Sequence, residues 1–240
     1  MAVKSLIERI IIRILPQSVK YRILENAKCP EDSYLNISYS QEGEDMILNR
    51  IFETQSEGFF IDIGAHHPFR FSNTYKFYKR GWKGINIDPN PNSKQQFDLF
   101  RPNDISIEFG ISDTKGSLKY YNFYEKALNT FSEKRAEEYQ KENWPLESVI
   151  NIETFPLADI LNKYLIPNQR IDFMTIDVEG LEMQVLLSNN WDLYKPNVIL
   201  IEMLNVPFEE LIHGDIYNLL LEHGYKYIAK TINTVFFQLE

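Results

Sequence analysis

The stretch FFIDIGAHHPFRFSNT, Phe59–Thr74, decides the fold of this chain. Phe59–Ile63 is an apolar run interrupted only by Asp62, and such a run of aromatic and β-branched residues predicts a buried parallel strand. Gly64 follows at once, and a residue without Cβ permits a sharp turn and the close approach of a ligand to the backbone. Residues 75–80, YKFYKR, then predict a helix. The order of strand, glycine turn and helix is typical of the ligand-binding corner of a doubly wound α/β sheet, although a turn without a ligand can have the same local sequence.

The glycine pattern of the corner indicates which cofactor it suits. A dinucleotide fold uses G-x-G-x-x-G, so that backbone amides can surround a pyrophosphate. Here Gly64 is followed by AHHPFR, without another glycine, and Pro68 has no N–H to donate. S-adenosylmethionine has no phosphate and offers a ribose diol and a cationic amino-acid end, which suit one glycine turn beside the Asp62 carboxylate. The sequence therefore favours S-adenosylmethionine over a nicotinamide dinucleotide.

Carboxylates recur where further strands are expected to end. Strands are predicted at residues 84–88, 105–111, 171–177 and 198–203, with a final hairpin at 225–229 and 234–239. Asp88 ends the second strand, where an acid can accept hydrogen bonds from both ribose hydroxyls. Asp113 follows the third strand in a polar turn, where we expect an adenine. Asp177 ends the fourth, otherwise apolar strand, so it must have hydrogen-bond partners or a function.

Length and composition limit the class of protein. A chain of 240 residues is expected to form one α/β domain with a large core. Its net charge is −9 and its pI is about 5.1, with no basic stripe, so nucleic acid is disfavoured as a partner. A single cysteine, Cys29, rules out an internal disulfide and fits a reducing cytoplasm. No apolar run is long enough to span a membrane.

Residues 1–30 are predicted to be a helical extension ahead of the main domain at residues 31–240. The segment KSLIERIIIRILP places isoleucines at helical spacing and carries an excess of basic residues. Such a helix can pack on its own domain or mediate self-association. It can also lie on an anionic membrane, which would make a cytoplasmic protein membrane-peripheral.

Residues 118–149 interrupt the alternation of strands and helices. The segment is rich in aromatic residues, including Tyr120, Tyr121, Tyr124 and Trp144. An insertion after the third strand is expected above the carboxyl edge of the sheet, as a substrate lid, and aromatic faces beside polar groups suit a sugar or a nucleotide. An ordinary packed excursion is the alternative.

Five motifs, in their order and spacing, resemble the FkbM family of S-adenosylmethionine-dependent methyltransferases. They are SQEGED (40–45), FIDIGAHHP (60–68), SNT (72–74), NIDPNP (86–91) and IDVEG (176–180). The resemblance implies a class I methyltransferase fold, a Rossmann-like, doubly wound sheet of seven mostly parallel strands with a reversed last strand. It also implies methyl transfer to oxygen, often on sugars of surface polysaccharides or antibiotics.

The placement of these motifs predicts the site. A helix predicted at residues 40–52, with Ser40 as its N-cap, places Gln41 and Glu42 at the amino-acid end of the cofactor. The residues expected to bind S-adenosylmethionine are Gln41, Glu42, Asp62, Gly64, His66, Asn73, Asp88 and Asp113. The residues expected to act in catalysis are Asp177, Glu179 and His213. A divalent ion held by Asp177 and Glu202 is an alternative that we do not expect.

The function expected from these residues is methylation of a sugar hydroxyl, in a nucleotide-activated sugar or a polysaccharide precursor. Methylation of an amine or a protein side chain is the nearest alternative. A nicotinamide-dependent oxidoreductase is disfavoured by the missing glycines, and a scaffold without chemistry is disfavoured by the intact Asp62, Asp88 and Asp177.

Overall fold

The computed structural model describes Pro16 and residues 35–240. The helix predicted within residues 1–30 therefore lies outside the described residues. The chain divides into two units, Met1–Ile37 and Ser38–Glu240, and the second contains every element discussed below. Among the described residues, no helix combines the length and the apolar content needed to cross a membrane.

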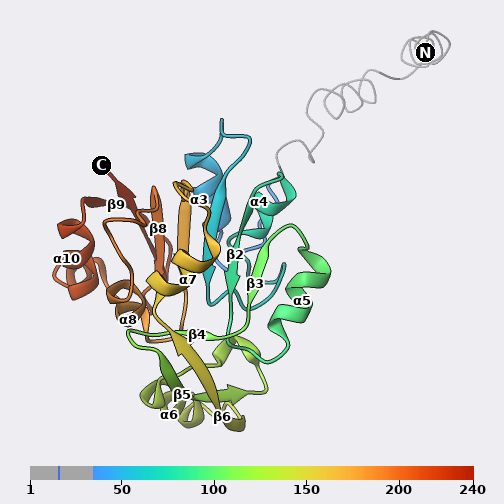
Figure 1. Cartoon of the computed structure of the whole chain (residues 1–240), viewed down its shortest axis with the longest axis vertical. Coiled ribbons are helices and arrows are strands. Elements are labelled where there is room, and N and C mark those ends of the chain that lie inside the picture. Colours follow the sequence, from blue (N-terminus) through green and yellow to red (C-terminus); the bar gives the residue numbers. More distant parts are fainter. Residues whose placement is uncertain (1–15, 17–34) are drawn as a thin grey trace. The chain divides into compact units, whose positions relative to one another are not determined.

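A sheet of seven strands organises the second unit (Figure 1). Its strands are β1 (Phe59–Ile63), β2 (Lys83–Ile87), β3 (Ile105–Ile107), β7 (Phe173–Ile176), β8 (Val198–Glu202), β9 (Tyr225–Lys230) and β10 (Thr234–Leu239). Their spatial order is β3-β2-β1-β7-β8-β10-β9. The pairs from β3 to β8 are parallel, whereas β10 runs antiparallel to both β8 and β9. This arrangement confirms the seven-stranded, mostly parallel sheet with a reversed last strand.

Successive side chains along each strand point to opposite faces of the sheet, and both faces are buried. Ile61 and Ile63 of β1 face one core cluster, which includes residues of α7 (Leu157–Tyr164), α8 (Glu182–Leu187) and α10 (Asp215–Glu222). Phe60 faces the opposite cluster, which includes residues of α3 (Glu44–Ile51) and α4 (Tyr75–Lys79). The remaining helices of the main layer are α5 (Ser93–Phe100) and α9 (Phe208–Leu211). Burial on both faces explains why these strands read as nearly continuous apolar runs.

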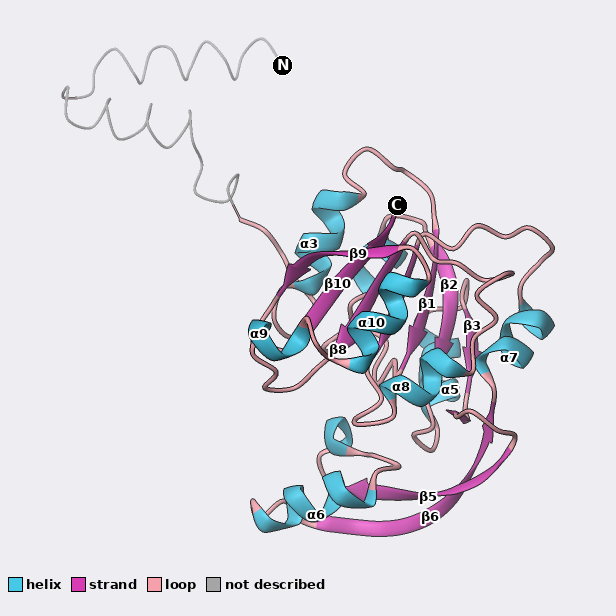
Figure 2. Ribbon diagram, turned by 90° about the vertical axis from the view of Figure 1, so that its left-hand side faces the viewer, coloured by secondary structure: helices cyan, strands magenta, loops and turns pink. Residues whose placement is uncertain are grey.

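A second, smaller sheet includes parts of the predicted insertion at residues 118–149 and extends beyond it at both ends. Its elements are β4 (Gly110–Ile111), β5 (Gly116–Phe123), η2 (Lys126–Leu128), α6 (Glu133–Lys141) and β6 (Leu146–Phe155), and the strand order is β4-β6-β5. In Figure 2 this sheet lies beyond the ends toward which the arrows of β1 and β2 point. The predicted third strand is too long, because β3 stops at Ile107 and Gly110–Ile111 pairs with β6 instead.

The predicted helix at residues 40–52 begins later than expected. Its N-cap is Gly43, with φ 86°, and the helix starts at Glu44. The hydroxyl of Ser40, the predicted cap, donates to the side chain of Asp45 (3.0 Å) and accepts from its backbone N–H (3.2 Å). The prediction of Ser40 as the cap residue is therefore wrong, because Gly43 occupies that position, although the Ser40 hydroxyl still contacts Asp45, the second residue of the helix.

Among the described glycines, Gly64 makes the closest approach to another segment of backbone. Gly64 has φ 82°, and a Cβ added to it would lie 1.6 Å from the carbonyl oxygen of Asp177. The end of β1 can thus touch the segment that follows β7 only because this residue has no side chain.

Replacing Gly64 with alanine is expected to destabilise the fold by more than about 4 kcal/mol or to prevent soluble expression, since the methyl group collides with backbone. Urea unfolding of both proteins measures the effect. Gly116→Ala is the matched control, because nothing lies within 4 Å of a Cβ at that position. A Gly64→Ala protein as stable as the control would contradict the contact.

Candidate active site

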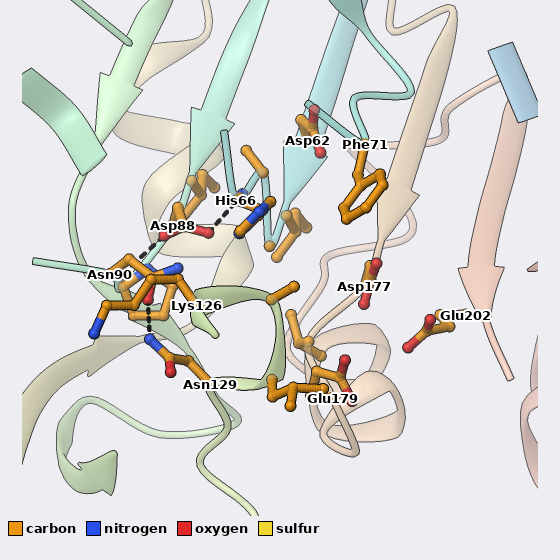
Figure 3. A pocket seen from close by; sticks show the side chains of 18 of the residues that line it. Asp62, His66, Phe71, Asp88, Asn90, Lys126, Asn129, Asp177, Glu179 and Glu202 are labelled. Carbon is orange, nitrogen blue, oxygen red and sulfur yellow. Dashed lines mark hydrogen bonds between the residues drawn. The ribbon is translucent and has the colours of Figure 1, made fainter. Parts of the chain in front are cut away.

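A cavity of about 330 Å³ lies at the carboxyl ends of β1, β2, β7 and β8 and extends to the insertion. Its size is within the range of small-molecule and cofactor sites, roughly 300–1,000 Å³. In Figure 3, His66 lies between Asp88 and Phe71, while Asp177, Glu179 and Glu202 gather on the other side. The two sides differ in how their carboxylates are satisfied.

Asp88 follows β2 and is held by backbone amides. Its Oδ2 accepts from the N–H of His66 (2.7 Å) and its Oδ1 from that of Asn90 (2.8 Å). Each carboxylate oxygen can accept more than one hydrogen bond, so both can still receive a ligand hydroxyl. Burial raises the pKa of Asp88 to about 6, although these hydrogen bonds oppose the shift. At pH 7 the group is therefore mostly an acceptor, as binding of a ribose diol requires.

Three neighbours on the glycine corner also line the cavity. Asp62 accepts from the hydroxyl of Thr74 (2.7 Å), and burial raises its pKa to about 6. Asn73 donates through Nδ2 to Thr175 Oγ1 (3.0 Å). The backbone of His66 is left-handed, with φ 53°, and both of its buried ring nitrogens lack partners among the described residues. Burial lowers the pKa of His66 to about 4, so its ring is neutral at pH 7 and faces the cavity with one donor and one acceptor.

The other side of the cavity holds three carboxylates. Asp177, Glu179 and Glu202 each offer an oxygen, and these atoms all lie within 4.8 Å of one another. Burial, followed by repulsion from Glu179, raises the pKa of Glu202 to about 8. Burial and the charge of Glu202 raise that of Asp177 well above its ordinary range. Like charges this close cannot all ionise, so the group retains a shared proton near neutral pH.

The insertion orients one member of this group. Tyr139 of α6 donates its hydroxyl to Glu179 Oε2 (2.5 Å), and Thr130 donates to the carbonyl oxygen of Glu179 (2.7 Å). Glu179 itself has φ 55°, a left-handed conformation that is uncommon outside glycine. The two contacts fix this strained turn.

A second set of contacts joins the insertion to the glycine corner. Arg70 forms an ion pair with Glu125 at 3.1 Å, and both residues line the cavity. The carboxamide oxygen of Asn90 accepts from the hydroxyl of Tyr120 (3.1 Å) and from Nδ2 of Asn129. The wall beside Asp88 is therefore built from β2 and the insertion together.

Sequence comparison identifies the family. The model of the FkbM methyltransferase domain matches residues 62–227. The chain belongs to the FkbM methyltransferase family. It is therefore a methyltransferase, and membership implies a cofactor of the S-adenosylmethionine type.

The FkbM methyltransferase also has distant structural neighbours. One, from Pyrococcus horikoshii, is described as a "putative RNA methyltransferase"; it is 11% identical, with a TM-score of 0.43 over 82% of this chain and 83% of that one. Another is a TehB-like SAM-dependent methyltransferase from Corynebacterium glutamicum, 9% identical, with a TM-score of 0.40 over 94% of this chain and 100% of that one. No curated protein matches the sequence.

Most of the predicted site residues of the methyltransferase share the main cavity. They are Gln41, Asp62, Gly64, His66, Asn73, Asp88, Asp177 and Glu179. Glu42 instead lines an adjoining hollow of about 20 Å³, where it accepts from the backbone and side-chain nitrogens of Asn233 (2.9 and 2.8 Å).

Two predicted residues lie elsewhere. Asp113 is exposed and hydrogen-bonds its neighbours Ser112 and Thr114, while the cavity wall after β3 is formed by residues 109–111. His213 is exposed in the turn between α9 and α10 and does not line the main cavity. Neither Asp113 nor His213 therefore lines the cavity.

Sequence reasoning missed several residues of the wall, among them Arg70, Asn90 and Asn129. A signal existed for Asn90, which stands in the PNPN turn directly after Asp88. No such signal existed for Asn129, because its position beside Asn90 depends on how the insertion packs against the end of β2.

The cavity fits a nucleoside cofactor of this type. The two oxygens of Asp88 have capacity for a ribose diol, and the unpartnered nitrogens of His66 are nearby hydrogen-bonding groups. Asp62 offers a carboxylate to a cationic amino group.

Replacing Asp88 with alanine is expected to weaken binding of S-adenosylhomocysteine by about 1–3 kcal/mol, because two ribose hydrogen bonds are lost. Isothermal titration calorimetry measures the change. Asp113→Ala is the matched control and should bind as the wild type does. If the two variants behaved alike, Asp88 would have no place in the cofactor site.

Replacing Glu202 with glutamine is expected to stabilise the protein increasingly as pH rises. The folded-state pKa of about 8 exceeds the ordinary 4.5, so the wild type loses stability across this interval, because the acid ionises in the unfolded chain while it stays protonated in the folded one. Glutamine does not ionise, and its advantage should reach about 1–3 kcal/mol at about pH 8.5 and be small at about pH 5.

Urea unfolding at the two pH values measures this difference, with exposed Glu222→Gln as the control. A pH-independent difference between Glu202→Gln and wild type would show that Glu202 is not a buried, proton-sharing acid.

Proposed function

We propose that this methyltransferase transfers a methyl group from S-adenosylmethionine to a hydroxyl oxygen of a sugar, in a nucleotide-activated sugar or a surface polysaccharide precursor. The observation that carries the proposal is the group Asp177, Glu179 and Glu202, which lines the cavity opposite the Asp88 side. When bound, the cofactor supplies an electrophilic methyl group. The protein must then hold the acceptor oxygen in line with this methyl group and accept the proton of the hydroxyl.

Asp177 is proposed as the group that receives this proton. An ordinary aspartate, with a pKa near 3.9, is a weak base. Burial and the neighbouring charge of Glu202 raise the pKa of Asp177, which makes its ionised form a stronger base. Glu202 is close enough to share the proton, and Glu179, held by Tyr139, can orient the acceptor. The exposed His213 has no comparable support.

The surroundings of these carboxylates favour a sugar. Phe71 lines the cavity and is 42% exposed, so an apolar ring face is available beside groups that accept hydroxyl hydrogens. This combination suits a ring with one apolar face and several hydroxyl groups.

Methyl transfer to an amine, free or on a protein side chain, is the second candidate. The same three carboxylates would attract an ammonium group and would have to deprotonate it before transfer. The divalent-ion alternative rests on the same oxygens, which could ligate a metal that acidifies a hydroxyl.

We also propose a cytoplasmic location, supported by the single cysteine in the sequence. Self-association or contact with an anionic membrane through the basic N-terminal segment remains part of the proposal, supported by its sequence alone.

Asp177→Asn is expected to lower kcat by roughly 100-fold or more, the usual scale for a general base, without a matching loss of affinity for S-adenosylhomocysteine. The measurement is transfer of labelled methyl from S-adenosylmethionine to a panel of nucleotide-activated sugars and of amines. His213→Ala is the comparison variant and should retain activity. A fully active Asp177→Asn enzyme would remove this role, labelling of amines alone would overturn the sugar proposal, and loss of activity in EDTA would indicate a metal.

A further inference from the structure

Arg101 is a buried cation that the methyl-transfer chemistry described above does not use. It follows α5, and its side chain is completely buried. Its Nε donates to Asp104 Oδ2 at 2.8 Å, and Nη2 lies 2.7 Å from the same oxygen. A buried guanidinium is costly unless it is paired, and Asp104 supplies the countercharge.

The other side of the guanidinium holds the loop between β1 and α4. Nη1 donates to Thr74 Oγ1 (2.9 Å), with longer contacts to Pro68 O (3.3 Å) and Ser72 Oγ (3.5 Å). This loop also carries Asn73, which lines the cavity. The side chain of Arg101, which follows α5, thus contacts the loop at three points.

The direction of the hydrogen bonds continues this contact to Asp62. A guanidinium only donates, so the Thr74 oxygen must accept from Arg101. The single hydroxyl hydrogen of Thr74 is then free to donate to Asp62 Oδ2, at 2.7 Å. Among the described residues Thr74 is the hydrogen-bond donor to this carboxylate, which leaves Oδ1 available to a ligand in the cavity.

The charges around Asp62 oppose one another. Burial and the nearby carboxylates of Asp88 and Asp104 disfavour its ionised form, whereas Thr74 and the positive charge of Arg101 favour it. Asp104 is itself neutralised by direct contact with Arg101. The relay from Arg101 is therefore the main support that the described residues give to an anion at Asp62.

We propose that Arg101 is a positioning residue that acts through Thr74 to hold Asp62 as the anionic anchor for the ammonium group of the cofactor. The inference rests on the S-adenosylmethionine-dependent function proposed above. It assigns a role to two residues that do not line the cavity.

The test is the affinity for S-adenosylhomocysteine as a function of pH, measured by calorimetry. Wild-type affinity should fall as pH drops through about 6, where Asp62 and Asp88 both become protonated. Thr74→Val removes the donor, so its affinity should be about 10-fold weaker at about pH 6.5. Its midpoint should move about one pH unit upward, the effect of losing one hydrogen bond to a charged group. Arg101→Lys should shift the midpoint in the same direction.

Three controls make the outcome specific. Thr74→Ser keeps the hydroxyl and should restore wild-type behaviour. Thr154→Val removes a buried hydroxyl in the second sheet that does not itself line the cavity and makes no contact with Asp62, and should leave the midpoint unchanged. Asp62→Asn removes the titrating group, so combining it with Thr74→Val should cause no further shift of the midpoint.

Each outcome decides between the proposals. A Thr74→Val protein with wild-type affinity and midpoint overturns the relay, even if Arg101→Lys does not fold. A shift in Thr154→Val equal to that in Thr74→Val also overturns it, since the effect would then be general destabilisation. A wild-type protein that binds no S-adenosylhomocysteine at any pH rejects the proposed cofactor instead.

Discussion

The contact between Gly64 and the backbone of Asp177 is the constraint on which the site depends. The N–H of Gly64 donates to Ile87 O (2.9 Å), and the N–H of Asp177 donates to Ile63 O (2.9 Å), so the ends of three neighbouring strands meet at one point. A side chain at Gly64 would force these ends apart. Because they meet, carboxylates that are distant in the sequence, including Asp62 and Asp177, line the same cavity. The close backbone approach is thus the origin of the concentration of acids.

That concentration is stabilised differently on the two sides of the cavity. Asp88 is satisfied by backbone amides, and Asp62 by a hydroxyl backed by a buried cation. Within the part of the chain that the structure describes, no cation forms an ion pair with Asp177 or Glu202, and these acids share protons instead. The first solution keeps Asp62 and Asp88 mostly anionic at pH 7, as ligand binding requires, whereas the second produces acids with pKa values raised further. Buried acids of the second kind reduce stability and are characteristic of functional sites.

The fold could be predicted from the sequence because its strands are buried on both faces. Apolar runs at Phe59–Ile63 and 198–203 stand out from their surroundings, and the last hairpin is flanked by clear turn residues. The break between β3 and β4 was not visible, because apolar residues stand at every second position throughout residues 105–111, as in one unbroken strand, whereas Gly110 packs against Phe131 of the insertion. Such a change of partner depends on contacts that local periodicity does not record.

The sequence correctly predicted cavity residues that stand directly at the end of a strand, as Asp88 and Asp177 do. It failed for residues in turns, where the conformation of the turn decides the direction of the side chain. Asp113 lies beyond β4 and is exposed, and His213 is exposed in a turn between two short helices. Arg101 gave no signal either, since an arginine at the end of an amphipathic helix is normally a solvent-exposed cap.

The insertion leaves and rejoins the main layer at one place, where Ile111 pairs with Phe155 in parallel register. Residues between these points can lengthen, shorten or change without altering the order of the seven main strands, since none of them pairs within that sheet. Over evolutionary time, such an arrangement lets descendants of one ancestor diversify in what they modify. The strand ends that carry Asp62, Asp88 and Asp177 can meanwhile be inherited unchanged.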